Sequence, residues 1–433
     1  MHATLAPSPH TRRFGFALVA LSLAAIAWLT LRPAHASSSA AIASHLCVVC
    51  GPLGGVDVLL NTLLFVPLGV GLNLSGLSAW KAVLVSFAIS LSIEAAQAFI
   101  AIGRAATLSD VLTNTLGGAI GFWSVGTLAP ARKRAAWLSA SWGAIWLLIQ
   151  IVSSYSLAPS LSPSQYYGQI AQPGGRMFHG QVDSARIGTI PIPNGAFADS
   201  RAIRGLLLNG SPIVAVVRFT EPTPYFASII RLADDRQRGI ASIGEQGDQL
   251  VFSIRTGASN LRLREPAFGM PGVFAGAPRT DSAAQTLVIG ARFNDGTVQL
   301  VAETRSGHRE LNLSPRAAQA WTVVLPFHGQ LESGGTERLA TFLWTSVLLI
   351  PLGYWSATLA RGLERVAALS LMAVFAALLA AGLILVPATF GLRGATPLDW
   401  IAALFGVGMG TALTFASNQQ LGSHHTSKNP ASA

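Results

Sequence analysis

The chain has 433 residues, of which 51% are hydrophobic and only 11% are charged. A soluble domain normally carries about 25% charged residues, so most of this chain is not an ordinary water-soluble domain. The net charge of +10 falls mainly in short loops between apolar runs, which indicates membrane orientation and argues against a nucleic-acid partner.

A helix needs about 20 mostly apolar residues to cross a bilayer. The sequence predicts a multi-span α-helical membrane protein with eight helices, at 14–31, 56–74, 81–101, 110–129, 135–152, 339–359, 366–388 and 398–417. The first run also fits a cleaved signal peptide, because Arg12 and Arg13 precede it and Ala34-His35-Ala36 follows. Its length exceeds the roughly 7–15 residues of a signal core, which favours a retained helix.

Lys and Arg in short loops set the orientation of the spans. With the N-terminus inside, nine such residues are cytoplasmic and four are outside. The cytoplasmic ones are Arg12, Arg13, Lys81, Arg132, Lys133, Arg134, Arg361, Arg365 and Lys428, and the outer ones are Arg32, Arg104, Arg338 and Arg393. We expect a bacterial inner (plasma) membrane protein with cytoplasmic ends, 1–13 and 418–433, and an extracytoplasmic domain, 153–335.

Polar side chains inside spans are costly in lipid and therefore mark candidate functional sites. At 1.5 Å per helical residue, Asn61 and Asn114 lie about 6 Å, and Glu94 about 10 Å, below the outer helix ends. These residues reach one level, where Arg104 of an outer loop is the natural counter-charge. We predict a ligand-binding pocket, without a metal or cofactor, lined by Asp57, Asn61, Glu94, Gln97, Arg104, Asp110 and Asn114.

A purely structural interpretation stays open for the same residues. Asp57 and Asp110 are placed to cap helix N-termini, and Glu94 and Arg104 to form a salt bridge within the bundle. Just outside the first span, Cys47-x-x-Cys50 fits a structural disulfide, which we favour, or a reversible redox pair. Zinc is a weaker interpretation, because a second pair of ligands is missing.

Three polar motifs occur in order within about residues 45–128. They are Asp57-x-x-x-Asn61-x-x-x-Phe65-x-Pro67-Leu68-Gly69, then Ser92-Ile93-Glu94-x-x-Gln97, then Arg104 followed by Asp110-x-x-x-Asn114-x-x-Gly117. Together they resemble the VanZ-like family, which is named for a protein associated with resistance to the glycopeptide teicoplanin. The resemblance implies a role in the cell envelope and no defined reaction. This chain is far longer than a minimal member.

The membrane region contains an apparent duplication. Arg104-x-x-Thr107-x-x-Asp110 is repeated as Arg393-x-x-Thr396-x-x-Asp399, and Gly117 and Gly121 are repeated as Gly406 and Gly410. Pro67-Leu68-Gly69 likewise returns as Pro351-Leu352-Gly353. We therefore predict two four-helix units, 14–129 and 135–417. The second is made of 135–152 and 339–417, with 153–335 inserted, and lacks counterparts of Asn61, Glu94 and Gln97.

The inserted segment alternates apolar and polar residues in short runs, which predicts an antiparallel β-sandwich. The predicted strands are Ile213–Thr220, Phe226–Leu232, Gln249–Arg255, Thr286–Phe293, Val298–Glu303 and Trp321–Leu325, with a hairpin turn at Asn294-Asp295-Gly296. The pattern is similar to laminin-G-like or concanavalin-like jelly rolls, which implies glycan binding. A structural or protein-contact sandwich is the alternative. Asp234, Asp235 and Glu245 are expected to be solvated loop charges.

Two functions follow from these features. The first is a non-enzymatic envelope protein that binds or handles a polar lipid, glycan or wall precursor at the outer leaflet and is linked to glycopeptide resistance. The second is an intramembrane enzyme that modifies such a substrate, with Glu94 as the candidate catalytic acid or base. We favour the first, because one buried carboxylate among amides suits recognition as well as catalysis. Membrane lipids are the expected partners.

Overall fold

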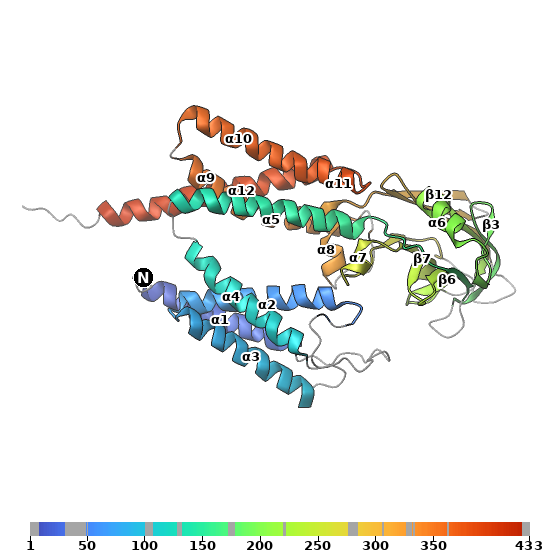
Figure 1. Cartoon of the computed structure of the whole chain (residues 1–433), viewed down its shortest axis with the longest axis horizontal. Helices are drawn as coiled ribbons and strands as arrows, with labels where there is room; N and C mark the ends of the chain where they lie inside the picture. Colours follow the sequence, from blue (N-terminus) through green and yellow to red (C-terminus); the bar gives the residue numbers. More distant parts are fainter. Residues whose placement is uncertain are drawn as a thin grey trace, which may run out of the picture. The chain divides into compact units, whose positions relative to one another are not determined.

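The computed structural model divides into two compact units, Met1–Arg134 and Ala135–Ala433 (Figure 1). The residues that the structure describes are 8–30, 49, 51–99, 107–127, 132–171, 178–219, 222–275, 285–304, 307–325, 331, 334–361 and 363–426.

The first unit is a bundle of four helices, α1 (Pro9–Thr30), α2 (Gly54–Leu74), α3 (Ala79–Phe99) and α4 (Leu108–Thr127). Its apolar core centres on Ile26, Phe65 and Leu68, which are all almost fully buried. Arg12 Nε of α1 donates to the Ser75 carbonyl oxygen at 3.3 Å, at the end of α2. The first helix therefore packs as a member of the bundle.

The second unit combines membrane helices with the inserted β domain. The helices are α5 (Arg132–Leu157), α9 (Gly335–Ala360), α10 (Arg365–Ala380), α11 (Val386–Thr389) and α12 (Pro397–Thr426). A short π-helical segment, η3 (Ala381–Leu385), joins α10 to α11, so that the three form one continuous helical segment. Trp146 of α5 lies in the core with Leu349 and Leu352 of α9, and Leu379, Leu383 and Ala403 complete this cluster.

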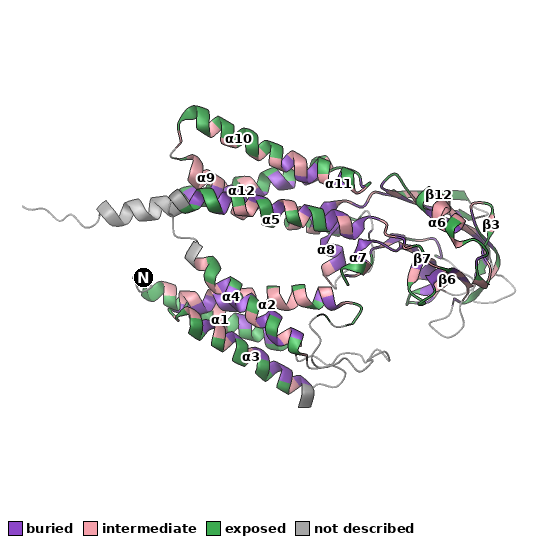
Figure 2. Ribbon diagram, in the orientation of Figure 1, coloured by how far each residue is buried: buried purple, intermediate pink, exposed green. Residues whose placement is uncertain are grey.

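Seven helices of the described residues are long and apolar enough to cross a membrane. The remaining expected span, 110–129, forms α4, a 20-residue helix that is not among the seven. Its sequence includes Asp110, Thr113 and Asn114, which lower its hydropathy. The helices expose large apolar side chains outward, such as Leu369, Met372 and Val374 of α10 (Figure 2). Contiguous apolar surface of this kind is expected of a lipid-facing helix.

Glycines let α4 lie directly against α2. A Cβ on Gly117 would overlap the backbone carbonyl of Thr62, and one on Gly121 would overlap that of Val66. In the second unit, Gly406 and Gly410 of α12 have the same relation to the carbonyls of Ser346 and Ile350 of α9. Each pair thus uses the same contact at corresponding positions, as the duplicated four-helix unit predicts. Small residues are the usual means of close helix approach in lipid.

The inserted domain is a sandwich of two six-stranded antiparallel sheets. One sheet has the order β4 (Gly195–Ala196), β1 (Tyr166–Ile170), β6 (Ala227–Asp234), β7 (Gly239–Gln246), β8 (Gln249–Ile254) and β9 (Ala267–Met270). The other has the order β12 (Gly307–Leu313), β11 (Thr297–Thr304), β10 (Gln285–Asn294), β5 (Ile213–Phe219), β2 (Gly180–Ile187) and β3 (Ile190–Pro191). Side chains from both sheets form one large apolar core.

Five of the six predicted strands are confirmed, as β5, β6, β8, β10 and β11. The predicted hairpin is also confirmed, because Asn294 pairs with Thr297 and both Asp295 and Gly296 have positive φ. The prediction of a strand at Trp321–Leu325 is wrong, since Trp321–Val324 forms a short helix, α8. Trp321 Nε1 donates to Thr341 Oγ1 of α9 at 3.1 Å, so this segment packs on the membrane helices and joins neither sheet.

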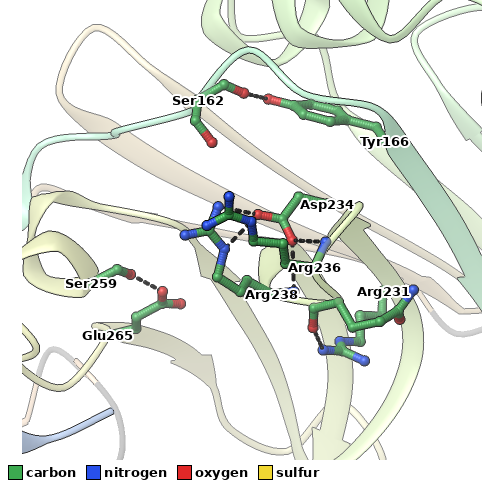
Figure 3. A network of polar contacts seen from close by, with 9 residues as sticks. Ser162, Tyr166, Arg231, Asp234, Arg236, Arg238, Ser259 and Glu265 are labelled. Carbon is green, nitrogen blue, oxygen red and sulfur yellow. Dashed lines mark hydrogen bonds and ion pairs between the residues drawn. The ribbon is translucent and has the colours of Figure 1, made fainter. Parts of the chain in front are cut away.

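Two acids that we expected to be solvated are fully buried, whereas Asp235 is exposed. Asp234 ends β6 and accepts hydrogen bonds from the backbone N–H groups of Arg236 and Arg238 and from Arg238 Nε (Figure 3). Its carboxylate therefore folds the β6–β7 turn around itself. These hydrogen bonds lower the pKa of Asp234 against the opposing effect of burial.

Glu245, near the end of β7, is also fully buried. Its Oε1 accepts a hydrogen bond from the Thr223 backbone N–H at 3.3 Å, and its Oε2 has no hydrogen-bond partner in the described part of the chain. Burial raises the pKa of this carboxyl group to about 7. The loop before β6 covers Glu245, and the local sequence gives no sign of this.

The glycine contacts predict opposite effects for two Gly→Ala substitutions. Gly121→Ala inserts a methyl group against the Val66 carbonyl and should lower the free energy of unfolding by about 1–3 kcal/mol. Gly408→Ala is the matched control, because nothing lies within 4 Å of its Cβ position, and alanine should stabilise that helix by up to about 1 kcal/mol. Thermal unfolding of the detergent-solubilised chain measures both. Equal melting temperatures would contradict the close contact.

The raised pKa of buried Glu245 predicts that the protein loses stability as the pH rises. The folded state keeps its proton up to about pH 7, whereas an unfolded Glu loses it near pH 4.5, so stability falls as pH rises through this window. The full effect is about 3 kcal/mol. The melting temperature of the wild type should drop more between pH 5 and pH 8 than that of Glu245→Gln. Asp235→Asn, at an exposed position in the β6–β7 turn, should behave like the wild type; a wild-type pH profile for Glu245→Gln would refute the prediction.

Candidate functional site

Three helices of the first unit bring polar side chains together at the start of α4. Asn61 comes from α2, Glu94 from α3, and Thr107 and Asp110 from the N-terminus of α4. Glu94 retains only 6% of its exposed surface, although it lies within an apolar helix. The close approach of α2 and α4 allows Asn61 Nδ2 to donate to Asp110 Oδ1 at 2.5 Å.

Thr107 and Asp110 form the N-terminal cap of α4. Thr107 Oγ1 donates to Asp110 Oδ2 at 2.9 Å and accepts from the Asp110 backbone N–H at 3.2 Å. The backbone N–H of Thr107 does not complete a capping box with Asp110, because it donates to Glu94 Oε2 at 2.9 Å. A capping carboxylate normally accepts this N–H. In the first unit, a carboxylate from another helix has taken that place.

The second unit has the unmodified version of the cap. Thr396 Oγ1 and the Thr396 backbone N–H both donate to Asp399 Oδ2, each at 2.8 Å, and the Asp399 N–H approaches Thr396 Oγ1 at 3.4 Å. Thr345 stands where the first unit has Asn61. Asp399 instead forms an ion pair with Arg316, with Nε and Oδ2 2.9 Å apart. The two sites share one framework and differ in what surrounds the aspartate.

A second set of contacts lies one turn deeper in the first unit. Asn114 Nδ2 donates to Ser90 Oγ at 2.9 Å, and Ser90 Oγ lies 3.4 Å from the Asp110 carbonyl oxygen. Asn114 is 3% exposed, and its Oδ1 has no hydrogen-bond partner in the described part of the chain. A buried acceptor without a donor is unusual in proteins. It is suited to accept a hydrogen bond from a ligand hydroxyl or ammonium group.

The predicted residues are only partly brought together. Asn61, Glu94, Asp110 and Asn114 belong to one region, which we call the α4 polar network, together with Ser90 and Thr107. Gln97 Nε2 donates to the Thr30 carbonyl oxygen at 3.0 Å and so ties α3 to α1. Asp57 is exposed in the first turn of α2. Arg104, Cys47 and Cys50 lie outside the described residues, so the predicted counter-charge and cysteine pair stay predictions.

Ser90 and Thr107 were not among the predicted site residues. Ser90 precedes Glu94 by four residues and therefore shares its helix face. Thr107 belongs to the repeated Arg-x-x-Thr-x-x-Asp motif. Both signals were present in the sequence, but serine and threonine are common in membrane helices and neither is diagnostic alone.

The match to a family model covers the same region. Residues 3–129, which include all four helices of the first unit, match VanZ/LLP1. This segment is a VanZ-like unit. The match extends the resemblance beyond 45–128 to include α1, and it contains every member of the α4 polar network. No curated protein and no solved structure matches the chain.

The α4 polar network of this VanZ-like unit offers hydrogen-bonding groups and negative charge. Its network combines two carboxylates, the Asn114 carbonyl oxygen and hydroxyl groups within a few ångströms, next to the positive end of α4. Hydrogen bonds in such a low-dielectric setting are stronger than in water. The arrangement is suited to bind hydroxyl, amide or ammonium groups.

Proposed function

We propose that the VanZ-like unit binds the polar part of an envelope lipid or wall precursor at the outer leaflet. The observation that carries this proposal is the altered cap of α4. Glu94 accepts the hydrogen bond of the Thr107 N–H, whereas at the start of α12 the corresponding N–H donates to Asp399 of the same helix. Capping therefore does not require a third-helix carboxylate. An ionised side chain costs up to about 2.5–3.5 kcal/mol at the centre of a membrane helix, and a role in ligand binding accounts for the presence of Glu94.

The chain order supports placing the network on the same side as the β-sandwich. If each helix crosses once, the starts of α2, α4, α9 and α12 all face the side on which the sandwich lies. The excess of Lys and Arg in the opposite loops supports an extracytoplasmic sandwich in the inner membrane. The network would then meet lipids or precursors of the outer leaflet, where glycopeptide antibiotics act. This location supports the proposed link to teicoplanin resistance, with the sandwich as a glycan-binding module.

Glu94 substitutions test the role of the network. Glu94→Gln keeps an acceptor for the Thr107 N–H and should retain lipid, whereas Glu94→Ala removes it. A hydrogen bond to a charged group contributes about 1.5–3 kcal/mol, so we expect Glu94→Ala to weaken lipid retention roughly 10- to 100-fold. Mass spectrometry of lipids bound to the purified chain measures this. Glu364→Gln, at an exposed position, is the matched control.

A second readout separates binding from catalysis. Each variant is returned to a deletion strain, and its teicoplanin susceptibility is measured. If Glu94→Gln restores the wild-type susceptibility and Glu94→Ala does not, recognition through hydrogen bonds is supported. Loss with both, at unchanged lipid retention, would identify Glu94 as a proton-transfer group and favour the enzyme. Retention and full function with both variants would refute the proposed site.

Cysteine labelling tests the orientation. In a chain with Cys47→Ser and Cys50→Ser, Asp235→Cys places a thiol on the exposed β6–β7 turn of the sandwich, and Glu364→Cys places one in the loop before α10. An impermeant maleimide should label Asp235→Cys in intact spheroplasts and Glu364→Cys only after lysis. The reverse pattern would place the sandwich in the cytoplasm.

A further inference from the structure

A cavity lies inside the second unit, where the sandwich meets the membrane helices. Its volume is about 340 Å³, within the lower part of the range of small-molecule sites. One wall comes from the sandwich and the segment after β12, including Phe268, Leu313 and Arg316. The other comes from the first turns of α9 and the loop before α12, including Arg338 and Arg393. We call it the junction cavity.

The junction cavity is lined by three guanidinium groups and one carboxylate. Arg316 is partly held by Asp399, which is 1% exposed. The guanidinium groups of Arg338 and Arg393 are exposed and make no hydrogen bond or ion pair within the described part of the chain. The lining carboxylate, Glu337, accepts a hydrogen bond from Gln319 Nε2 at 2.5 Å. The lining is therefore net positive, and two cations face the cavity without an acidic partner.

The position of the cavity indicates where its ligand comes from. Arg338 lies in the first turn of α9, and Arg393 lies four residues before α12 begins. Both therefore lie at the starts of the candidate membrane spans Gly335–Ala360 and Pro397–Phe415, where lipid head groups are expected. The positive ends of the two helices add to the charge of the arginines. Phe268, Leu313 and Leu331 supply apolar walls beside them.

We propose that the junction cavity binds a phosphate group, carried by an anionic lipid of the adjacent leaflet. A guanidinium group matches phosphate with two parallel hydrogen bonds, and two such groups without partners line this cavity. The apolar wall suits the glycerol and first acyl carbons of a phospholipid. This site is distinct from the α4 polar network, because it belongs to the second unit and contains none of the network residues.

The test uses the full chain and a double variant. Arg338→Gln/Arg393→Gln removes both cations that lack partners. The control, Arg201→Gln/Arg236→Gln, removes the same charge from two exposed positions of the sandwich outside the cavity lining. Native mass spectrometry should show retained phosphatidylglycerol for the wild type and the control, with at least tenfold weaker retention for Arg338→Gln/Arg393→Gln. Phosphatidylcholine should be retained weakly by all three.

Further experiments identify the molecule that carries the phosphate and control for misfolding of the variants. Arg338→Lys/Arg393→Lys keeps the charge without the planar fork and should retain an intermediate amount of lipid. If inorganic phosphate displaces the lipid at equal concentration, the site takes a soluble phosphate and the lipid assignment is wrong. Equal retention by both Gln variants, or equal loss from both, would overturn the phosphate site. The loss of phosphatidylglycerol caused by Arg338→Gln/Arg393→Gln should be the same in a Glu94→Ala background, so this proposal and the proposed function fail separately.

Discussion

The contact between glycines of one helix and backbone carbonyls of its neighbour determines the geometry of both membrane units. Helices in lipid gain little from the hydrophobic effect and depend on close packing instead. Because Gly117 and Gly121 have no side chain, α4 can approach α2 closely enough for Asn61 to reach Asp110. Larger residues would separate these helices and break the hydrogen bond. The α4 polar network therefore depends on residues that take no part in its chemistry.

The same packing in the second unit leads to a different outcome. Gly406 and Gly410 hold α12 against α9, and Asp399 begins α12 as Asp110 begins α4. In the second unit, the aspartate is neutralised by Arg316, which comes from the inserted domain. In the first unit, the corresponding cap is connected to α2 and α3. One copy thus uses its aspartate to attach a domain, and the other builds a polar network around it.

Features that depend on local sequence were predictable. The helical spans follow from apolar run length, the hairpin from Asn294-Asp295-Gly296, and the cap from the repeated motif. Features that depend on burial by segments distant in the sequence were not predictable. Glu245 occupies a position of β7 that the alternation of the strand turns inward, but its burial depends on the loop that contains Thr223. Arg316 and Asp399 are far apart in the sequence, and nothing local indicates that they meet.

The strand predicted at Trp321–Leu325 failed for a similar reason. Its residues favour β structure by composition, yet packing against α9 selects a helix. Trp321 finds its hydrogen-bond partner, Thr341, on a membrane helix. Tertiary contact therefore outweighed local propensity at the point where the sandwich attaches. Four of the predicted site residues, Asn61, Glu94, Asp110 and Asn114, lie together on three helices, but their hydrogen bonds depend on the relative positions of the three backbones.

The attachment of the sandwich has a mechanical consequence. Trp321 and Gln319 bond to α9, Arg316 bonds to Asp399 of α12, and the β10–β11 turn at Gly296 lies against the loop before α12. These contacts are spread over two helices, so the sandwich cannot shift without moving helix ends. Arg316 lines the junction cavity and also holds Asp399. A guanidinium group has five donors, so an anion in the cavity can share Arg316 with Asp399. A bound anion would thus strengthen the same junction that fixes the sandwich to the membrane.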